Sequence, residues 1–242
     1  MPAPRTRAVD VDTPVGPARL HVHPARSALA LVVLGHGAGR GVDTADLLGL
    51  ARDLPDEGVT VVLVDQPWVV AGRRMAAAPA QLDLAWMAAL AHARRSARVT
   101  RRVPLVVGGR SAGARVACRT AVEVGADAVL LLAFPLAPPA ARHDPVRRAK
   151  ARAVRAGELG VPWKAGLPVV VAQGDRDAFG TVADLADLLP FTGSDGVALV
   201  DASAHLHVVP GADHSLTAGR NGPDPAPALL AAALTAVGLV TR

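Results

Sequence analysis

The chain has 242 residues, of which 51% are hydrophobic and 19% charged. This length and balance suit a single α/β domain with a large buried core and exclude an intrinsically disordered chain. No Gly-X-Y period and no sustained heptad is present, which excludes collagen-like and coiled-coil architectures. The single cysteine, Cys118, excludes a disulfide framework and a cysteine-based zinc site.

The charge balance by itself is typical of a nucleic-acid-binding protein, because 26 basic and 21 acidic side chains give a net charge of +5. Aromatic residues make up only 2% of the chain and tyrosine is absent, so no stacking platform for single-stranded bases is available. The basic residues are scattered except at 94–102 and 142–155. We therefore expect no nucleic-acid partner.

Neither a targeting segment nor a membrane span is predicted. Residues 1–10 contain three charged side chains and no apolar core, unlike a secretory signal peptide. The longest apolar stretch, 128–141, is interrupted by three prolines and is shorter than the roughly 18 residues that span a bilayer. We expect a soluble cytoplasmic protein that makes no membrane contact.

Two kinds of apolar pattern predict strands. Near-continuous apolar runs predict strands buried on both faces, as in a parallel sheet covered by helices. These runs occupy 28–34, 59–65, 105–109, 128–133 and 169–173, with a sixth strand predicted at 205–209. Alternating segments at 9–11 and 19–23 flank turn-forming residues and predict an antiparallel hairpin at the sheet edge.

Helical patterns occupy the connections between these strands. They lie at about 44–56, 79–95, 112–124, 142–156, 182–189 and 225–237. This alternation predicts right-handed βαβ crossovers, and hence one doubly wound α/β domain over residues 1–242 with a mostly parallel sheet. The longest connection between adjacent strands, 135–166, is a candidate cap or substrate-side insertion.

The sharpest local signal is the pentapeptide Gly109-Arg110-Ser111-Ala112-Gly113. It follows a predicted strand and opens a predicted helix, the context in which G-x-S-x-G forms the nucleophile elbow of α/β hydrolases. Small flanking residues let the strand and helix pass close together. The turn would raise the Ser111 hydroxyl above the sheet and direct the Ala112 N–H toward a developing oxyanion.

An acid and a base follow later strands, in the order that this fold uses. Asp177 lies in the segment after the strand at 169–173, and His214 lies in the loop after the last strand. An imidazole would take the proton of Ser111, and a buried carboxylate would fix the imidazole tautomer. Asp175 is the competing acid, while Asp213 is expected to shape its loop.

A glycine-rich segment, Gly35-His36-Gly37-Ala38-Gly39, directly follows the first buried strand. Small residues there would let the backbone approach a scissile carbonyl and supply a second oxyanion N–H. We favour Ala38 for that donor and place Gly37 next, as a substrate-binding residue. His36 is interpreted as a structural residue that braces the loop.

Together these motifs resemble the α/β-hydrolase superfamily, in its small dienelactone-hydrolase-like form. Within it, the chain is most similar to a bacterial family related to animal testis-expressed hydrolase-like proteins. The matching segments are GHGAGRG (35–41), DQPWVVAGRR (65–74), VGGRSAGARVACRTA (107–121), LAFPLAPP (132–139), QGDRDAFG (173–180) and PGADHSL (210–216). The resemblance implies that Ser111, Asp177 and His214 are nucleophile, acid and base. A mechanism that uses these three side chains implies no cofactor.

Other candidate residues have competing interpretations. Arg110 and Arg115 could attract an anionic substrate, although salt bridges to neighbouring loops are favoured. Trp68 is the best apolar candidate for the pocket mouth, and Cys118 is expected to be a buried small side chain. Two His-x-His pairs, at 21–23 and 205–207, suggest a metal site. We expect none, because their strands belong near opposite edges of the sheet.

The sequence therefore favours a serine hydrolase that cleaves an ester or related acyl bond of a small molecule. An acyltransferase or thioesterase would use the same triad. A protein of another class, a hydrolase fold kept as a binding or scaffold module, stays an alternative because fold does not fix function. The sequence does not predict an oligomeric state.

Overall fold

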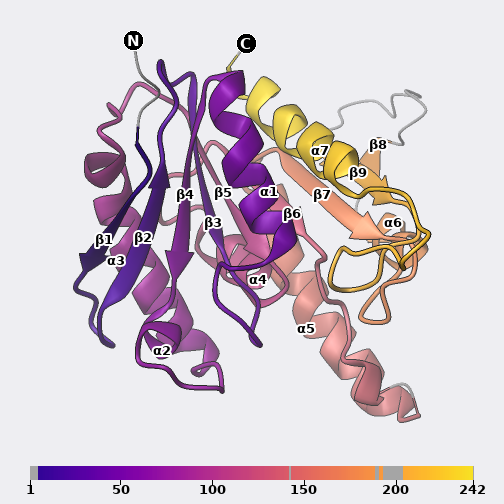
Figure 1. Ribbon diagram of the computed structural model, residues 1–242. Coiled ribbons are helices and arrows are strands. Elements are labelled where there is room, and N and C mark those ends of the chain that lie inside the picture. The colour runs from indigo at the N-terminus through magenta and orange to yellow at the C-terminus, as the bar shows by residue number, and fades with distance from the viewer. Residues whose placement is uncertain (1–4, 142, 189–190, 193–203, 242) are drawn as a thin grey trace.

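One twisted sheet organises the molecule. The computed structural model describes residues 5–141, 143–188, 191–192 and 204–241. Within them, nine strands lie in the order β1-β2-β4-β3-β5-β6-β7-β9-β8 (Figure 1). The strands are β1 (Arg7–Val11), β2 (Ala18–His23), β3 (Ala30–Gly35), β4 (Val59–Asp65), β5 (Leu105–Arg110), β6 (Ala128–Leu132), β7 (Val169–Gly174), β8 (Phe191–Thr192) and β9 (Ala204–Val209).

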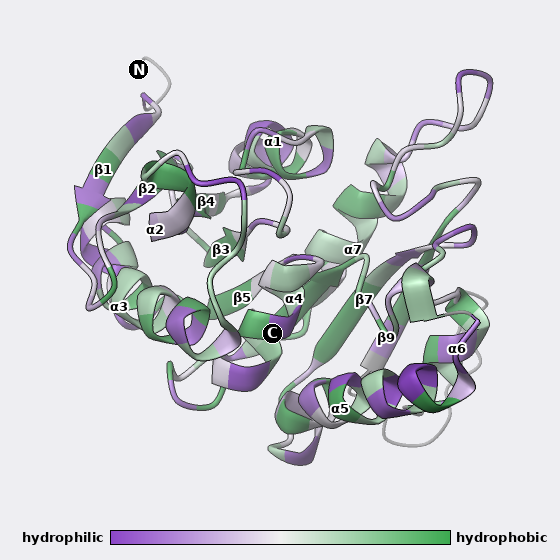
Figure 2. Cartoon of the chain, turned by 90° about the horizontal axis from the view of Figure 1, so that it is seen from below, coloured by the Kyte–Doolittle hydropathy of each residue, from purple (hydrophilic) through white to green (hydrophobic). Residues whose placement is uncertain are grey.

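Helices cover both faces of this sheet (Figure 2). The α-helices are α1 (Ala45–Asp53), α2 (Pro67–Val70), α3 (Pro79–Ala97), α4 (Ala112–Thr120), α5 (Pro145–Lys164), α6 (Val182–Ala186) and α7 (Ala226–Gly238). Two short 3₁₀ turns, η1 (Leu54–Glu57) and η2 (Pro139–Ala141), complete the described elements. In the view from below, α1 and α7 lie over one face of the sheet, and α3, α4 and α5 over the other.

The sheet is mixed in the predicted way. β1 pairs with β2, and β2 with β4, in antiparallel fashion, whereas each remaining neighbouring pair is parallel. The doubly wound α/β fold with its N-terminal hairpin is confirmed.

The near-continuous apolar runs are buried on both sides, because successive strand side chains point to opposite faces. On β3, Leu31 and Val33 belong to the core beneath α3 and α4. Val32 and Leu34 belong to the core beneath α1 and α7. The continuous pattern therefore correctly predicted central strands between two helical layers.

The element boundaries differ from the predictions at a few places. α5 runs to Lys164, past the predicted end at 156, because its later turns pack into the core through the fully buried Leu159. Pro162 removes one helical hydrogen bond, and the helix ends two residues later. The short helix α2 and the two-residue strand β8 were not predicted. The predicted helix start at 142 and end at 189 lie outside the described residues, as do the ends of the expected 1–242 domain.

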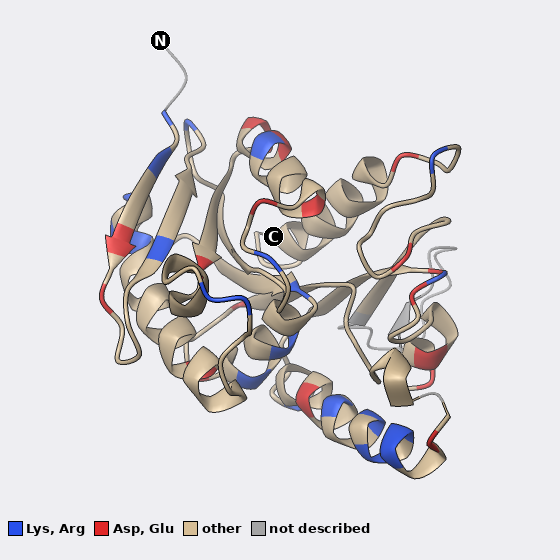
Figure 3. Ribbon diagram, turned by 60° about the horizontal axis from the view of Figure 1, so that its bottom comes forward, with Lys and Arg blue, Asp and Glu red and all other residues tan. Residues whose placement is uncertain are grey.

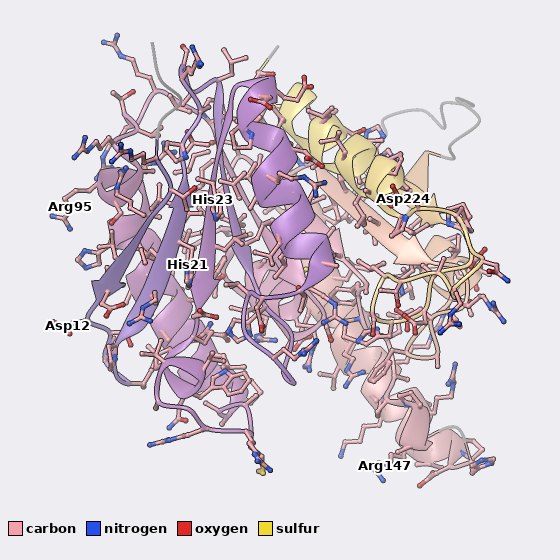
Figure 4. The ribbon with its side chains drawn as sticks, in the orientation of Figure 1. Asp12, His21, His23, Arg95, Arg147 and Asp224 are labelled. Carbon is pink, nitrogen blue, oxygen red and sulfur yellow. The ribbon has the colours of Figure 1, made fainter. Side chains whose placement is uncertain are left out.

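The candidate cap at 135–166 takes the form of a crossover helix that is tied to both neighbours. Arg115 of α4 forms a bidentate ion pair with Glu158 of α5, with N–O distances of 2.6 and 2.8 Å. On the other side, Arg152 donates to Asp184 of α6. The first turns of α5 extend beyond the rest of the fold and carry a series of basic side chains, with Arg147 near the tip (Figures 3 and 4). That this segment borders a substrate stays a prediction.

We expect opposite stability effects from alanine at two helical glycines. A Cβ on Gly113 of α4 would lie 2.5 Å from the Gly35 carbonyl oxygen, whereas one on Gly49 of α1 would meet nothing within 4 Å. Gly113→Ala should lower the free energy of unfolding by about 1–3 kcal/mol through overpacking. Gly49→Ala should raise it by roughly 0.5–1 kcal/mol. Urea denaturation of both variants tests this, and equal effects would show that the close approach at Gly113 is unimportant.

Candidate active site

Ser111 occupies a strained turn between β5 and α4. Its φ of 53° lies in the left-handed region that non-glycine residues rarely adopt. Gly35 and Gly109 are register partners on β3 and β5, and a Cβ on either Gly109 or Gly113 would collide with the Gly35 backbone. The glycines therefore let α4 begin close to β3. The Ser111 N–H is held by the Leu132 carbonyl at 2.9 Å.

Three side chains from separate loops form a continuous hydrogen-bonded chain at the carboxyl ends of the parallel strands. Ser111 Oγ lies 2.9 Å from His214 Nε2, and His214 Nδ1 lies 2.8 Å from Asp177 Oδ2. With Nδ1–H donating to the carboxylate, Nε2 is left as an acceptor for the serine hydroxyl. The arrangement can move a proton off Ser111 and stabilise the imidazolium that results.

Asp177, rather than Asp175, faces the imidazole. The Asp177 side chain is fully buried, and its Oδ1 accepts from the Phe179 N–H at 2.8 Å. Its Oδ2 also accepts from Gln173 Nε2 at 2.9 Å. Asp175 is exposed and lies on the outer side of the same loop. The carboxylate is thus oriented by donors on both oxygens, as a buried charge requires.

Two residues beside the Ser111–His214–Asp177 series were not predicted from the sequence. The Phe179 ring stacks on the His214 imidazole, with ring centroids 3.9 Å apart and planes inclined by 23°. Gln173, fully buried at the end of β7, donates to both Asp177 and the Gly180 carbonyl. The sequence offered one signal for these two residues, which is their closeness to Asp177. Gln173 ends the preceding apolar run, and Phe179 lies two residues after the acid.

His36 braces the glycine-rich loop, as the sequence indicated. Its Nε2 accepts from the Gln66 N–H at 3.0 Å, which leaves Nδ1–H to donate to the Gly37 carbonyl at 2.8 Å. Burial lowers the pKa of His36, so the neutral ring that these two bonds need is favoured. The side chain spans from the end of β3 to the end of β4.

A small cavity lies against the two segments expected to supply oxyanion donors. Ala38 and Ala112 both line it, and Trp68, Leu82, Trp86 and Val116 form its apolar walls. Its volume is about 10 Å³, near the minimum that holds one water molecule. Trp68 is buried and packs edge-on against His36, with centroids 5.3 Å apart, so it forms a wall of the cavity rather than an exposed rim.

The guanidinium of Arg110 is engaged by the protein itself. Its Nη2 donates to the His214 carbonyl at 3.0 Å, and its Nε lies 3.4 Å from Asp46 Oδ2 in the first turn of α1. Arg115 also forms an ion pair, with Glu158.

The comparison with protein families fits this geometry. A family model described as an alpha/beta hydrolase domain matches residues 28–238, which is most of the chain. The chain belongs to the alpha/beta hydrolase domain family. No curated protein matches the sequence significantly. The narrower similarity to testis-expressed hydrolase-like proteins stays a prediction.

Solved structures share the fold of this α/β-hydrolase chain at low sequence identity. A lidless α/β serine hydrolase from Xanthomonas campestris is 20% identical, with a TM-score of 0.61, covering 87% of this chain and 86% of its own. A dienelactone hydrolase from Anabaena variabilis is 17% identical, with a TM-score of 0.66 and coverages of 98% and 97%. Est1E from Butyrivibrio proteoclasticus is 12% identical, with a TM-score of 0.71 and coverages of 97% and 99%.

The His-x-His pairs of this α/β-hydrolase chain do not converge. Figure 4 shows His21 and His23 on β2, and β4, β3, β5, β6 and β7 separate that strand from β9, which carries the other pair. His21 Nε2 instead contacts Asp65 Oδ2 at 2.8 Å. Among the described residues, no group of three or more His, Cys, Asp or Glu side chains is arranged to hold a metal ion.

The remaining interpretations of single residues agree with the structure. Cys118 is fully buried, and burial raises the pKa of its thiol. Asp213 Oδ1 accepts from the Ser215 N–H at 2.7 Å and so shapes the loop that carries His214.

None of the helices in the described part of the chain is long and apolar enough to cross a membrane.

The buried, neutral His36 predicts a pH-dependent stability difference. Its folded-state pKa lies below the ordinary value of 6.5, so the unfolded chain binds a proton first as pH falls. The stability that His36 contributes is complete above pH 6.5 and is lost as pH falls toward the lowered folded-state pKa. His36→Ala should cost about 1–3 kcal/mol near neutral pH, because the Gln66 N–H loses its acceptor.

Urea denaturation of both proteins across this pH range measures the effect. The gap between wild type and His36→Ala should narrow below pH 6.5. Partial burial also lowers the pKa of His23 and His207, but their contributions cancel in the difference. A gap that is constant with pH would contradict a neutral His36.

Proposed function

We propose that the protein is a serine hydrolase that cleaves an ester or related acyl bond of a small molecule through an acyl-enzyme intermediate. The observation that carries the proposal is the chain from Ser111 through His214 to the buried Asp177, with contacts of 2.9 and 2.8 Å. Its support is joint, because a strained serine, an oriented imidazole and a buried carboxylate lie within hydrogen-bond distance of one another in the order that nucleophilic catalysis needs.

The proposed reaction has two halves. His214 Nε2 takes the Ser111 proton as Oγ attacks the carbonyl carbon, and the imidazolium then gives that proton to the departing alkoxide. In the second half, His214 takes a proton from water, whose oxygen attacks the acyl carbon, and returns the proton to Ser111 Oγ as the acid leaves. Asp177 keeps its charge and stabilises the imidazolium throughout.

Backbone donors would stabilise the oxyanion. Ala112 is the first residue of α4, so its N–H has no helical acceptor, and within the described residues neither it nor the Ala38 N–H donates to another protein group. Both residues line the same small cavity beside Ser111. We assign them as the oxyanion hole, with the helix N-terminus adding a favourable dipole.

The acyl group is proposed to be short. Its carbonyl oxygen would lie between Ala38 and Ala112, and Gly37 leaves space for the backbone to approach it. The cavity beyond them is closed by Trp68 and Val116 and is about 10 Å³ in volume. That volume suits a methyl-sized group rather than a long chain.

A fluorophosphonate probe tests the serine mechanism. Wild type should be labelled, whereas Ser111→Ala and His214→Ala should lose labelling and ester hydrolysis by about 10⁴-fold or more. Asp177→Asn should also lose most of its activity, because the imidazole would adopt the wrong tautomer. Asp175→Asn is the matched control and should behave as wild type. A folded wild type that resists labelling would favour the scaffold alternative.

A series of p-nitrophenyl esters tests the acyl pocket. We expect kcat/KM to be highest for acetate and to fall steeply with each added methylene, because Trp68 and Val116 block extension. Val116→Ala should shift the optimum to an acyl chain about one methylene longer, worth roughly 0.8 kcal/mol for that ester. Val122→Ala, at an exposed position next to α4, is the control. Equal activity on acetyl and octanoyl esters would show that the acyl group lies elsewhere.

A further inference from the structure

The acid and base loops form one backbone-linked unit. β7 and β9 are neighbours in the sheet, so the loops that follow them lie together. The Arg176 N–H donates to the Ala212 carbonyl at 3.0 Å, and the Asp175 N–H to the Val209 carbonyl at 3.4 Å. The geometry between Asp177 and His214 is therefore fixed by main-chain bonds as well as by their own contact.

The serine lies outside this unit. It follows β5, and β6 separates β5 from β7. In the described residues, two hydrogen bonds join the turn at 109–113 to the base loop at 210–218: Ser111 Oγ with His214 Nε2, and Arg110 Nη2 with the His214 carbonyl. The first must break and re-form during the proposed reaction. The second is the connection that can persist.

Arg110 is well placed to hold that connection. Its side chain is 13% exposed, and the Asp46 carboxylate beside it is 2% exposed. Among the described residues, neither the Asp46 oxygens nor Arg110 Nε has a hydrogen-bond partner, so the 3.4 Å contact between them is an ion pair that gives the guanidinium its counter-charge. A Cβ on Gly37 would lie 3.4 Å from Arg110 Nη1, so the same guanidinium also lies beside the loop expected to supply an oxyanion donor.

We propose that Arg110 is a positioning residue that holds the His214 loop, through its main-chain carbonyl, at the distance from Ser111 that proton transfer requires. The inference rests on the proposed function. Arg110 is adjacent to the serine in sequence, so the tether joins the base directly to the turn that carries the nucleophile. A hydrogen bond donated by a charged guanidinium is stronger than a neutral one, and Asp46 supplies the counter-charge at 3.4 Å.

The matched pair Arg110→Lys and Arg115→Lys tests the proposal. Both arginines lie beside Ser111, both are paired with a carboxylate, and the substitution keeps the charge at each. Of the two, Arg110 is the one that hydrogen-bonds to the His214 loop within the described residues, whereas Arg115 pairs with Glu158. With neutral p-nitrophenyl acetate, Arg110→Lys should lower kcat by about 10- to 100-fold, the cost of misplacing a catalytic group by roughly 1 Å. Its KM should change little, fluorophosphonate labelling should slow equally, and Arg115→Lys should match wild type.

Three outcomes would overturn the proposal. One is labelling and turnover of Arg110→Lys at the wild-type rate. A second is an equal loss in Arg115→Lys, which would show a general packing effect. The third is a raised KM confined to anionic esters with unchanged kcat, which would make Arg110 a substrate contact.

A chemical rescue separates positioning from stability. Arg110→Ala should regain part of its kcat when methylguanidinium is added at concentrations too low to denature the protein, whereas urea at the same concentration should have no effect. If Arg110→Ala does not fold because Asp46 is left unpaired, the double variant Asp46→Asn with Arg110→Gln removes both charges of this pair and should show the same loss of kcat. Unchanged kcat in that double variant would also count against the tether.

Hydrogen exchange distinguishes failure of this inference from failure of the proposed function. In the full-length protein, peptides covering 210–218 should exchange faster in Arg110→Lys than in wild type or Arg115→Lys, whether or not the protein hydrolyses esters. An inert wild type with this difference would reject the hydrolase proposal and keep the tether. Equal exchange in all three proteins would reject the tether.

Discussion

The close approach of two strands and a helix at the carboxyl ends of β3 and β5 sets the geometry of the whole site. Gly35 and Gly109 face each other in register, and Gly113 lies against the same stretch of backbone. With no Cβ in the way, α4 can begin directly after β5, at the cost of a strained φ at Ser111. Because Gly35 immediately precedes His36, this contact also brings the glycine-rich loop beside the serine.

Around this contact, buried polar groups are held by hydrogen bonds to other parts of the protein. Asp177 is oriented by Gln173 and the Phe179 N–H, and Phe179 stacks on the imidazole that Asp177 accepts from. His36 bridges the ends of β3 and β4. A buried polar group without such partners is costly, so these bonds restrict each loop to few arrangements.

The family match and the structural neighbours agree on the fold. Because the neighbours have low sequence identity to this chain and a fold does not fix function, the chemistry has to be inferred from the residues of this chain. Two features of this chain bear on the selectivity of the proposed site. Under the proposed function, the small apolar cavity beside Ala38 and Ala112 would limit the size of the acyl group. The extended basic helix α5 is joined to α4 and α6 by ion pairs. Selectivity is therefore expected to come from a rigid site.

The sequence by itself determined the central strands, the crossover order and the positions of Ser111, Asp177 and His214, because hydrophobic periodicity and glycine placement are local signals. The resemblance to α/β hydrolases favoured Asp177 over Asp175, and His36 was interpreted as a structural residue. Only the tertiary structure decided what surrounds them. The contact between Arg110 and the His214 carbonyl joins residues 104 positions apart, and the stacking of Phe179 depends on how two loops pack. Such contacts arise from the packing of whole elements, and no periodicity within a segment encodes them.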